Sequence, residues 1–309
     1  MSFKQSDYYT TAQRAIEQVP GFRSAWQKFI KHTILFQRSE SLAMNYGRNI
    51  AQIALHFGKV PHHVEIEDIK TYLYNKAVHE RKSEGYFRQT VYGLRYWYRL
   101  FDQEANAIQL PPIRKKKSLP AVLSRQECRA LFKAPPLLKH RFLLAFGYSS
   151  GLRMNELRML KCADVDVDRM QIHVRMGKCN RDRYVPLSRI IADKLPLYHR
   201  EFQIQTYLFE GKTPGQPMGR RSIAYIIAQA LAKTNIVKKV SMHTLRHSYA
   251  THLLEDGVDI YSIQRLLGHS DIQNTITYLH IARLRPLPGH SPLDTLYGRI
   301  PSCDCGQGA

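Results

Sequence analysis

Long apolar stretches are missing from this 309-residue sequence. No run approaches the ~20 apolar residues that a membrane-spanning helix needs, so we expect neither a spanning segment nor a membrane partner. The first residues, MSFKQSDYYTTAQRAIEQ, also lack the apolar core of a secretory signal. We therefore expect a soluble protein that stays in the cytoplasm.

Cysteine is scarce, and its positions do not suit a disulfide framework. The five cysteines are odd in number and scattered, at Cys128, Cys162, Cys179, Cys303 and Cys305. The last two form a C-x-C pair, but a structural zinc site needs four ligands and no partner pair is evident. We expect neither disulfides nor a bound metal or other cofactor.

Acidic residues are also in short supply. The chain has 25 Asp and Glu against 46 Lys and Arg, which gives a formal net charge of +21. Such an excess favours a polyanionic partner, and nucleic acid is the leading candidate. An anionic membrane fits less well, because the basic residues are not gathered on one stripe of an amphipathic helix.

Residues 22 to 102 carry apolar positions at helical intervals. In the stretch LAMNYGRNIAQIALHF they recur on one side, at Leu42, Tyr46, Ile50, Ile53, Ala54 and Phe57. This pattern predicts a compact helical domain over residues 1–110. Its lysines and arginines are interleaved with tyrosines, and we interpret most of these residues as a solvated face over an aromatic core.

The segment LPPIRKKKSLP, residues 110 to 120, breaks the helical pattern with three prolines. Its four successive positive charges lead us to interpret residues 111–123 as a basic interdomain linker. Immediately afterwards, Ser124 and Glu127 have the spacing of a capping box, in which the serine caps a helix and the glutamate bonds back to the cap. A second domain is therefore expected to begin at residue 124.

The second domain, residues 124–285, combines predicted helices with one β-hairpin. Over residues 170 to 187 the helical period gives way to alternation around a Gly-Lys-Cys-Asn turn. Helices are predicted before and after this hairpin, and three glycines are placed to end them, namely Gly151, Gly257 and Gly268. We expect a mainly α protein: an N-terminal helical bundle and an α-rich domain with a small antiparallel sheet.

Four short segments of the second domain stand out. They are Gly151-Leu-Arg-Met-Asn-Glu156-Leu, Gly177-Lys178, His243-Thr-Leu-Arg246-His247, and Leu267-Gly-His269 followed nine residues later by Tyr278. Each is ordinary alone, because an arginine near a helix start is usually an ion-pair partner and a hairpin lysine is usually solvated. Their order and spacing are more informative than any one of them.

Together these segments resemble the signature of the tyrosine recombinase, or phage integrase, family over roughly residues 118 to 283. The resemblance implies an active-site set of Arg153, Lys178, His243, Arg246, His269 and Tyr278. It further implies that double-stranded DNA is cut and rejoined through a 3′-phosphotyrosine, and that residues 1–110 clamp the duplex. Four copies of the chain would act on two sites, without metal or nucleotide.

The chemistry of phosphodiester transfer accounts for these residue types. A tyrosine phenol, with an ordinary pKa near 10, must lose its proton to attack, and the attack places more negative charge on the phosphoryl oxygens. Arg153 and Arg246 can each offer paired N–H donors to those oxygens. By analogy with the family, His269 adds a donor, His243 bonds the phosphate or takes the tyrosine proton, and Lys178 protonates the leaving 5′-oxygen.

Two histidines in this region also suit a metal site. His243 and His247 have the i, i+4 spacing of a helical zinc pair, but Thr244 stands where a metalloprotease has glutamate, and no acidic third ligand follows. His247 and His252 are therefore interpreted as structural or DNA-contacting residues. Tyr249 on the same predicted helix is interpreted as core.

The departures from the family pattern are small. The turn lacks a second glycine that relatives often have after Lys178, and Leu279 stands where many have threonine. Glu156, three residues after Arg153 on the same helical face, is expected to hold the guanidinium in place. The tail, residues 286–309, is expected to dock on a neighbouring copy.

Several alternatives stay open. A type IB topoisomerase uses the same nucleophile, although the paired H-x-L-R-H and L-G-H motifs and the size favour recombination. A non-catalytic architectural DNA-binding protein is the rival from another class, and the filled active-site positions argue against it. Within recombination, integration or excision of a mobile element is favoured over Xer-type dimer resolution, because the tail is longer than the compact Xer-type ending.

Overall fold

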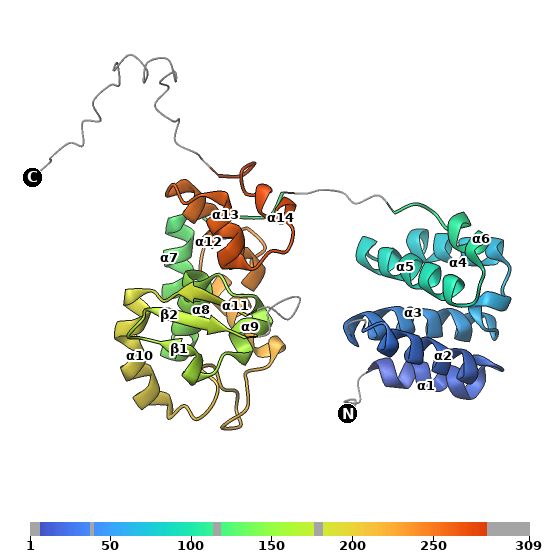
Figure 1. Cartoon of the computed structure of the whole chain (residues 1–309), viewed down its shortest axis with the longest axis horizontal. Coiled ribbons are helices and arrows are strands. Elements are labelled where there is room, and N and C mark those ends of the chain that lie inside the picture. Colours follow the sequence, from blue (N-terminus) through green and yellow to red (C-terminus); the bar gives the residue numbers. More distant parts are fainter. Residues whose placement is uncertain (1–6, 38–39, 114–118, 176–181, 283–309) are drawn as a thin grey trace, which may run out of the picture. The chain divides into compact units, whose positions relative to one another are not determined.

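The computed structural model of the chain describes residues 7–37, 40–113, 119–175 and 182–282 (Figure 1). The chain divides into two compact units, residues 1–116 and 117–309, and each has hydrophobic clusters of its own. The described part is mainly helical with one small antiparallel sheet, which confirms the predicted fold class. Within those ranges, no helix is both long and apolar enough to cross a membrane.

The N-terminal unit is helical throughout its described residues. Its elements are α1 (Asp7–Gln18), α2 (Phe22–Leu35), α3 (Glu40–Phe57), η1 (Pro61–His63), α4 (Ile66–Val78), α5 (Glu84–Leu100) and α6 (Glu104–Gln109). Ser83 caps the start of helix α5, because its hydroxyl accepts a hydrogen bond from the amide of Tyr86 at 3.2 Å. The helical pattern predicted over residues 22 to 102 is confirmed by α2 to α5.

Aromatic residues form much of the core of this unit. Phe22, Phe29 and Trp97 are fully buried, and the ring centroids of Phe22 and Trp97 lie 6.0 Å apart. The indole Nε1–H of Trp97 donates to Nδ1 of His62 at 3.1 Å, and burial lowers the pKa of His62 to about 4, which keeps that nitrogen an acceptor at neutral pH. Each buried ring contributes about 1.5–3 kcal/mol of hydrophobic free energy, so these rings fix α2 against α5.

The C-terminal unit is organised around a largely buried helix, α8 (Leu138–Ser150). Three helices pack against it, namely α7 (Arg125–Lys133), α10 (Arg189–Phe202) and α12 (Met242–Glu255). The predicted capping box at the start of α7 is confirmed. The Ser124 hydroxyl accepts from the Glu127 amide at 3.1 Å, and the Ser124 amide donates to the Glu127 carboxylate at 2.6 Å.

The other elements of this unit are short. They are α9 (Met154–Met159), η2 (Cys162–Asp164), β1 (Val165–Asp166), β2 (Gln171–Val174), β3 (Arg183–Pro186), α11 (Arg220–Leu231), α13 (Ile260–Leu267) and α14 (Gln273–Ile276). Gly151 and Gly268 occupy the C-cap positions of α8 and α13 with positive φ, as predicted, and Gly257 follows the end of α12, also with positive φ.

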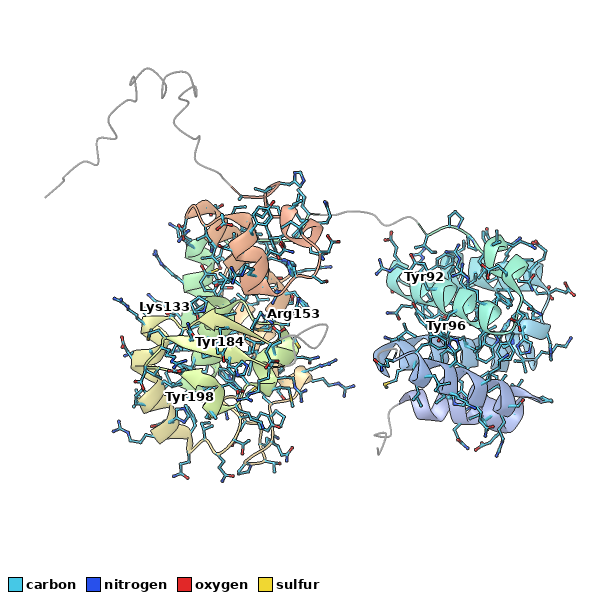
Figure 2. The ribbon with its side chains drawn as sticks, viewed as in Figure 1. Tyr92, Tyr96, Lys133, Arg153, Tyr184 and Tyr198 are labelled. Carbon is cyan, nitrogen blue, oxygen red and sulfur yellow. The ribbon has the colours of Figure 1, made fainter. Side chains whose placement is uncertain are left out.

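The three strands form an antiparallel sheet in the order β1–β2–β3. Ile172 pairs with Val185 and both side chains are buried. The neighbouring pair, His173 and Tyr184, stack their rings at 4.8 Å on the outer face, where Tyr184 is exposed (Figure 2). Strands β2 and β3 confirm the predicted hairpin, while Lys178, in the connection between them, lies outside the described residues.

Candidate active site

Arg153 stands where α8 turns into α9. The turn needs glycine at position 151, because φ is +59° there and a Cβ would lie 2.4 Å from Cδ1 of Tyr249. Two residues later, the Arg153 guanidinium donates through Nη1 to Oε1 of Glu156 at 2.8 Å and through Nη2 to the carbonyl of Gly268 at 2.9 Å. The α8–α9 turn and the end of α13 are therefore joined by this side chain.

Arg246 extends from α12 and is almost completely buried, with 3% of its surface exposed. Its Nη1 donates to the carbonyl of Gly151 at 2.8 Å and its Nη2 to the carbonyl of Leu267 at 2.5 Å. Burial and the neighbouring Arg153 lower the pKa of this guanidinium to about 10. It remains cationic at neutral pH, so Arg246 and Arg153 both place positive charge beside the end of α13.

Glu156 is a largely buried acid beside these arginines, with 8% of its side chain exposed. Its carboxylate accepts from Arg153 at 2.8 Å and from both Nη groups of Arg183 at 3.0 and 2.8 Å, and it lies 3.8 Å from Arg246. Burial alone would raise the pKa of Glu156, but the hydrogen bonds from Arg183 and Arg153 lower it to about 2. The expected contact with Arg153 is present, whereas the contribution of Arg183 was not anticipated from the sequence.

His269 follows the C-cap of α13 and is neutral at physiological pH. Burial, together with the nearby positive charges of Arg246 and Arg153, lowers its pKa to about 3. A 2.9 Å hydrogen bond joins its Nδ1 to the hydroxyl of the buried Thr275, which fixes the orientation of the ring. The ring therefore lies nearly parallel to that of Tyr278, with the centroids 6.5 Å apart.

Tyr278 follows α14 and is 2% exposed. Its ring packs in a cluster with α12 and α13 side chains, including Ala250 and Leu267, and burial raises its pKa while Arg246 and Arg153 oppose the increase. The hydroxyl shares a 3.0 Å hydrogen bond with Nδ1 of His247. In this arrangement the phenol is protonated at neutral pH and its oxygen is withdrawn from the surface.

The histidines of α12 make contacts that the sequence pattern does not specify. His247, interpreted from the sequence as structural or DNA-contacting, bonds the hydroxyl of Tyr278, and burial and the neighbouring His243 and Arg246 lower the pKa of His247 to about 4. His252 is buried and bonds the hydroxyl of Tyr148 at 2.7 Å, which is a structural contact. His243 lies exposed in the first turn of α12, and its pKa is lowered by partial burial and the two arginines.

The structure thus brings together four of the six predicted site residues through tertiary contacts: Arg153, Arg246, His269 and Tyr278. His243 lies on α12 one turn before Arg246, and Lys178 is not among the described residues. Over the described ranges, no group of three or more potential ligands is arranged to hold a metal ion. Cys303 and Cys305 lie outside those ranges.

Comparison with known proteins places this helical chain, with its cluster of basic side chains, in a known class of DNA-processing enzymes. The sequence profile of the phage integrase family matches residues 121–285, and the chain belongs to that family. A putative integrase/recombinase of Sinorhizobium fredii is 34% identical over 255 residues, covering 82% of this chain and 83% of the relative. The protein is accordingly a tyrosine site-specific recombinase.

Two further comparisons agree with this assignment. Tyrosine recombinase XerA of Thermococcus kodakarensis is 37% identical over 212 residues, covering 66% of this chain and 74% of the relative. The crystal structure of a lambda integrase dimer bound to a core site has a TM-score of 0.69 at 17% identity, and covers 87% of this chain and 99% of that one. The structural likeness establishes a shared fold.

Proposed function

We propose that the chain cuts and rejoins double-stranded DNA through Tyr278, and that it serves the integration or excision of a mobile element. The observation that carries the proposal is the convergence of two anchored arginines and a neutral, oriented histidine around Tyr278. The family relatives include both integrases and Xer recombinases, so chromosome or plasmid dimer resolution is the second candidate.

The proposed reaction is a transfer of one phosphodiester bond. The Tyr278 oxygen attacks phosphorus and becomes bonded to it, the bond from phosphorus to the 5′-oxygen breaks, and the phenolic proton is lost to a base. Arg153 and Arg246 keep unused N–H donors that can bind the non-bridging oxygens, where charge accumulates in the transition state. Conservation of the bond energy in the phosphotyrosine then allows another 5′-hydroxyl to reverse the step.

The other proposed roles follow from position and protonation state. His269 is neutral, so its unbonded ring nitrogen is suited to donate one further hydrogen bond to the phosphate. His243, exposed in the first turn of α12, is assigned a phosphate contact, while His247 holds the phenolic hydroxyl. Lys178 is assigned, through the family resemblance, to protonating the leaving 5′-oxygen.

Tyr278 must leave its packed position before it can react. At 2% exposure its hydroxyl is covered by protein, and a phosphodiester cannot approach it in line from solvent. We infer that binding of DNA, and contacts between copies in the proposed tetramer on two sites, shift the segment that follows α14. Docking of residues 286–309 on a neighbouring copy is proposed as one such contact.

The N-terminal unit is proposed to clamp the duplex, with residues 111–123 as the linker to the catalytic domain at 124–285. A hollow of about 600 Å³ on this unit supports an anion-binding role. Four basic side chains line it among aromatic rings, namely Arg14, Arg48, Lys76 and Lys82. Glu80, which pairs with Lys76 and Lys82, offsets part of this charge. A DNA-bound enzyme of this kind would work in the cytoplasm.

The decisive experiment uses nicked DNA substrates from which the cleaved strand end diffuses away, so that the covalent intermediate is trapped. Candidate sites are taken from the DNA on either side of the gene. We expect the wild type to form a protein–DNA adduct that survives denaturant, and Tyr278→Phe, which removes only the attacking hydroxyl, to form none while still binding DNA. An adduct that persists in Tyr278→Phe would refute the assignment.

The biological role needs a different readout. Recombination is measured between two copies of the cleaved site placed on one plasmid or on two. Joining of separate molecules as efficiently as excision supports the mobile-element role, whereas a strong preference for resolving two copies on one circle supports dimer resolution.

The architectural alternative makes a different prediction. It would be favoured if the wild type binds a DNA site tightly enough to protect it from nuclease but forms no covalent adduct on that site.

A further inference from the structure

Three arginines converge on the C-terminal end of α13. The carbonyl oxygens of residues 266, 267 and 268 accept hydrogen bonds from Arg183 (2.9 Å), Arg246 (2.5 Å) and Arg153 (2.9 Å), in that order. The end of a helix leaves its last carbonyls without partners and carries partial negative charge, so cations stabilise it. Two of these arginines have proposed roles at the phosphate, and Arg183 has none.

Arg183 uses its guanidinium differently from the other two. Its Nε donates to the carbonyl of Leu266, and its two Nη atoms donate to the two oxygens of Glu156 at 3.0 and 2.8 Å. All three nitrogens are therefore engaged inside the protein, and the side chain is 11% exposed. Arg183 has three of its five N–H donors bound to protein acceptors, whereas Arg153 and Arg246 each have two bound and keep more donors for a phosphate.

The C-cap of α13 is shaped to admit this side chain. Gly268 has φ of +62°, and a Cβ at that position would lie 3.0 Å from Cδ of Arg183. Arg183 thus packs across the residue that precedes His269. From β3 it contacts both the acid that holds Arg153 and the segment that carries His269.

We propose that Arg183 is a positioning residue for the phosphate-binding arginines, acting through Glu156 and the end of α13. This inference rests on the proposed function. By holding both carboxylate oxygens of Glu156, Arg183 prevents that carboxylate from turning fully onto Arg153 and Arg246. Without Arg183, Glu156 would pair more closely with them and compete with the DNA phosphate for their charge.

The test compares Arg183→Gln with wild type on two suicide substrates. One has an ordinary scissile phosphate, and the other has a methylphosphonate there, in which a neutral methyl group replaces a charged non-bridging oxygen. We expect Arg183→Gln to slow adduct formation about 100-fold on the ordinary substrate, similar to the loss of one oxyanion donor. On the methylphosphonate the slowing should shrink to a few-fold, because less charge has to be stabilised there.

The difference between the two substrates in the rate loss of Arg183→Gln distinguishes a positioning role from a general folding defect. A merely structural defect would slow both substrates by the same factor, and that result, or no slowing at all, would overturn the proposal. Should Arg183→Gln fail to fold, Arg183→Lys carries the same comparison, since lysine keeps the charge but cannot hold both carboxylate oxygens in one plane. Failure of the proposed function is recognised separately, by wild type forming no adduct.

Arg158→Gln is the matched control. Arg158 is also a partly buried arginine, and its Nε donates to a distant backbone carbonyl, that of Met218, at 3.0 Å. The substitution removes the same chemical group outside the cluster around Glu156. Arg158→Gln is expected to cleave both substrates at rates close to wild type, and its melting temperature shows how much stability such a bond contributes.

Discussion

His247 contacts the hydroxyl of Tyr278, the proposed nucleophile. Since His247 is neutral at neutral pH, its Nδ1 can orient the phenol without adding a positive charge to the buried cluster. A hydrogen bond of this kind contributes about 1–3 kcal/mol when its loss leaves a buried partner unsatisfied. The orientation of the proposed nucleophile therefore depends on a side chain outside the six residues that the family signature provides.

We expect His247→Ala to slow adduct formation about 10- to 100-fold, with DNA affinity unchanged, because the phenol loses its buried partner. His247→Asn should recover part of this loss, since an amide group can occupy the place of Nδ1. Single-turnover cleavage of the suicide substrate measures the rate.

His252→Asn is the matched control for this experiment. His252 lies on the same helix and bonds a different tyrosine hydroxyl, that of Tyr148, at 2.7 Å. The variant is expected to lower the melting temperature while leaving single-turnover cleavage near the wild-type rate. A His247→Ala enzyme that cleaves as fast as wild type would show that the contact is only a packing feature.

At the scale of elements, the turn between α8 and α9 in the C-terminal unit is tightly constrained. Gly151 ends α8, its carbonyl accepts from Arg246, and the space where a Cβ would stand is occupied by the ring of Tyr249. Gly257, after α12, has φ of +89° but open space around the Cβ position. Both glycines have positive φ, but only Gly151 has a side chain packed where a Cβ would stand.

Gly257→Ala is expected to lower the free energy of unfolding by about 1–2 kcal/mol, the cost of a left-handed conformation for a residue with a Cβ. Gly151→Ala should cost about 1–3 kcal/mol more, because the tyrosine ring must also move. Urea denaturation followed by circular dichroism measures both. Equal losses for the two variants would mean that Tyr249 moves aside freely.

Element boundaries were predictable where a local rule sets them. The capping box at Ser124 and the glycines after α8 and α13 act within a few residues, and the sequence displays such rules directly. The hairpin was predictable because apolar and polar residues alternate along a strand that buries one face of its sheet. Ile172 and Val185 are the buried residues of that face. In these cases the physical cause and the sequence pattern occupy the same short segment.

The candidate site was predictable only in part. The motif spacings identify Arg153, Arg246, His269 and Tyr278, whose contacts the structure now describes. The bond from Arg183 to Glu156 joins residues 27 positions apart, and that from His247 to Tyr278 joins residues 31 apart. Both separations are far longer than the few residues over which a helix or strand pattern relates side chains, so only the tertiary fold specifies these contacts.

At the scale of the whole molecule, the net charge of +21 governs how the protein meets DNA. Each phosphate neutralised by a lysine or arginine releases counterions, so the affinity falls as salt rises. In the N-terminal unit, the hollow that contains Arg48, Lys76 and Lys82 concentrates part of this charge, and Glu80 offsets it through ion pairs with both lysines.

We expect binding to a duplex site to weaken about 1,000-fold or more between 50 and 200 mM salt, as for proteins with many phosphate contacts. Lys82→Gln should reduce the slope of log affinity against log salt by about one. Glu80→Gln is a control that should change the slope of log affinity against log salt in the opposite direction. It removes the carboxylate that pairs with Lys76 and Lys82, so both lysines become available to phosphates and the slope should steepen. Fluorescence anisotropy measures the affinities, and a flat salt response in wild type would contradict the expectation.

Both tryptophans of the chain, Trp26 and Trp97, belong to the N-terminal unit, and Trp97 is buried in its aromatic core. The catalytic unit has none. Intrinsic tryptophan emission, excited at the red edge where tyrosine does not absorb, therefore follows unfolding of one unit while far-ultraviolet ellipticity follows both. Tryptophan fluorescence is therefore an intrinsic probe of the N-terminal unit. A difference between the fluorescence and ellipticity melting curves would show that the two units unfold in succession and not together.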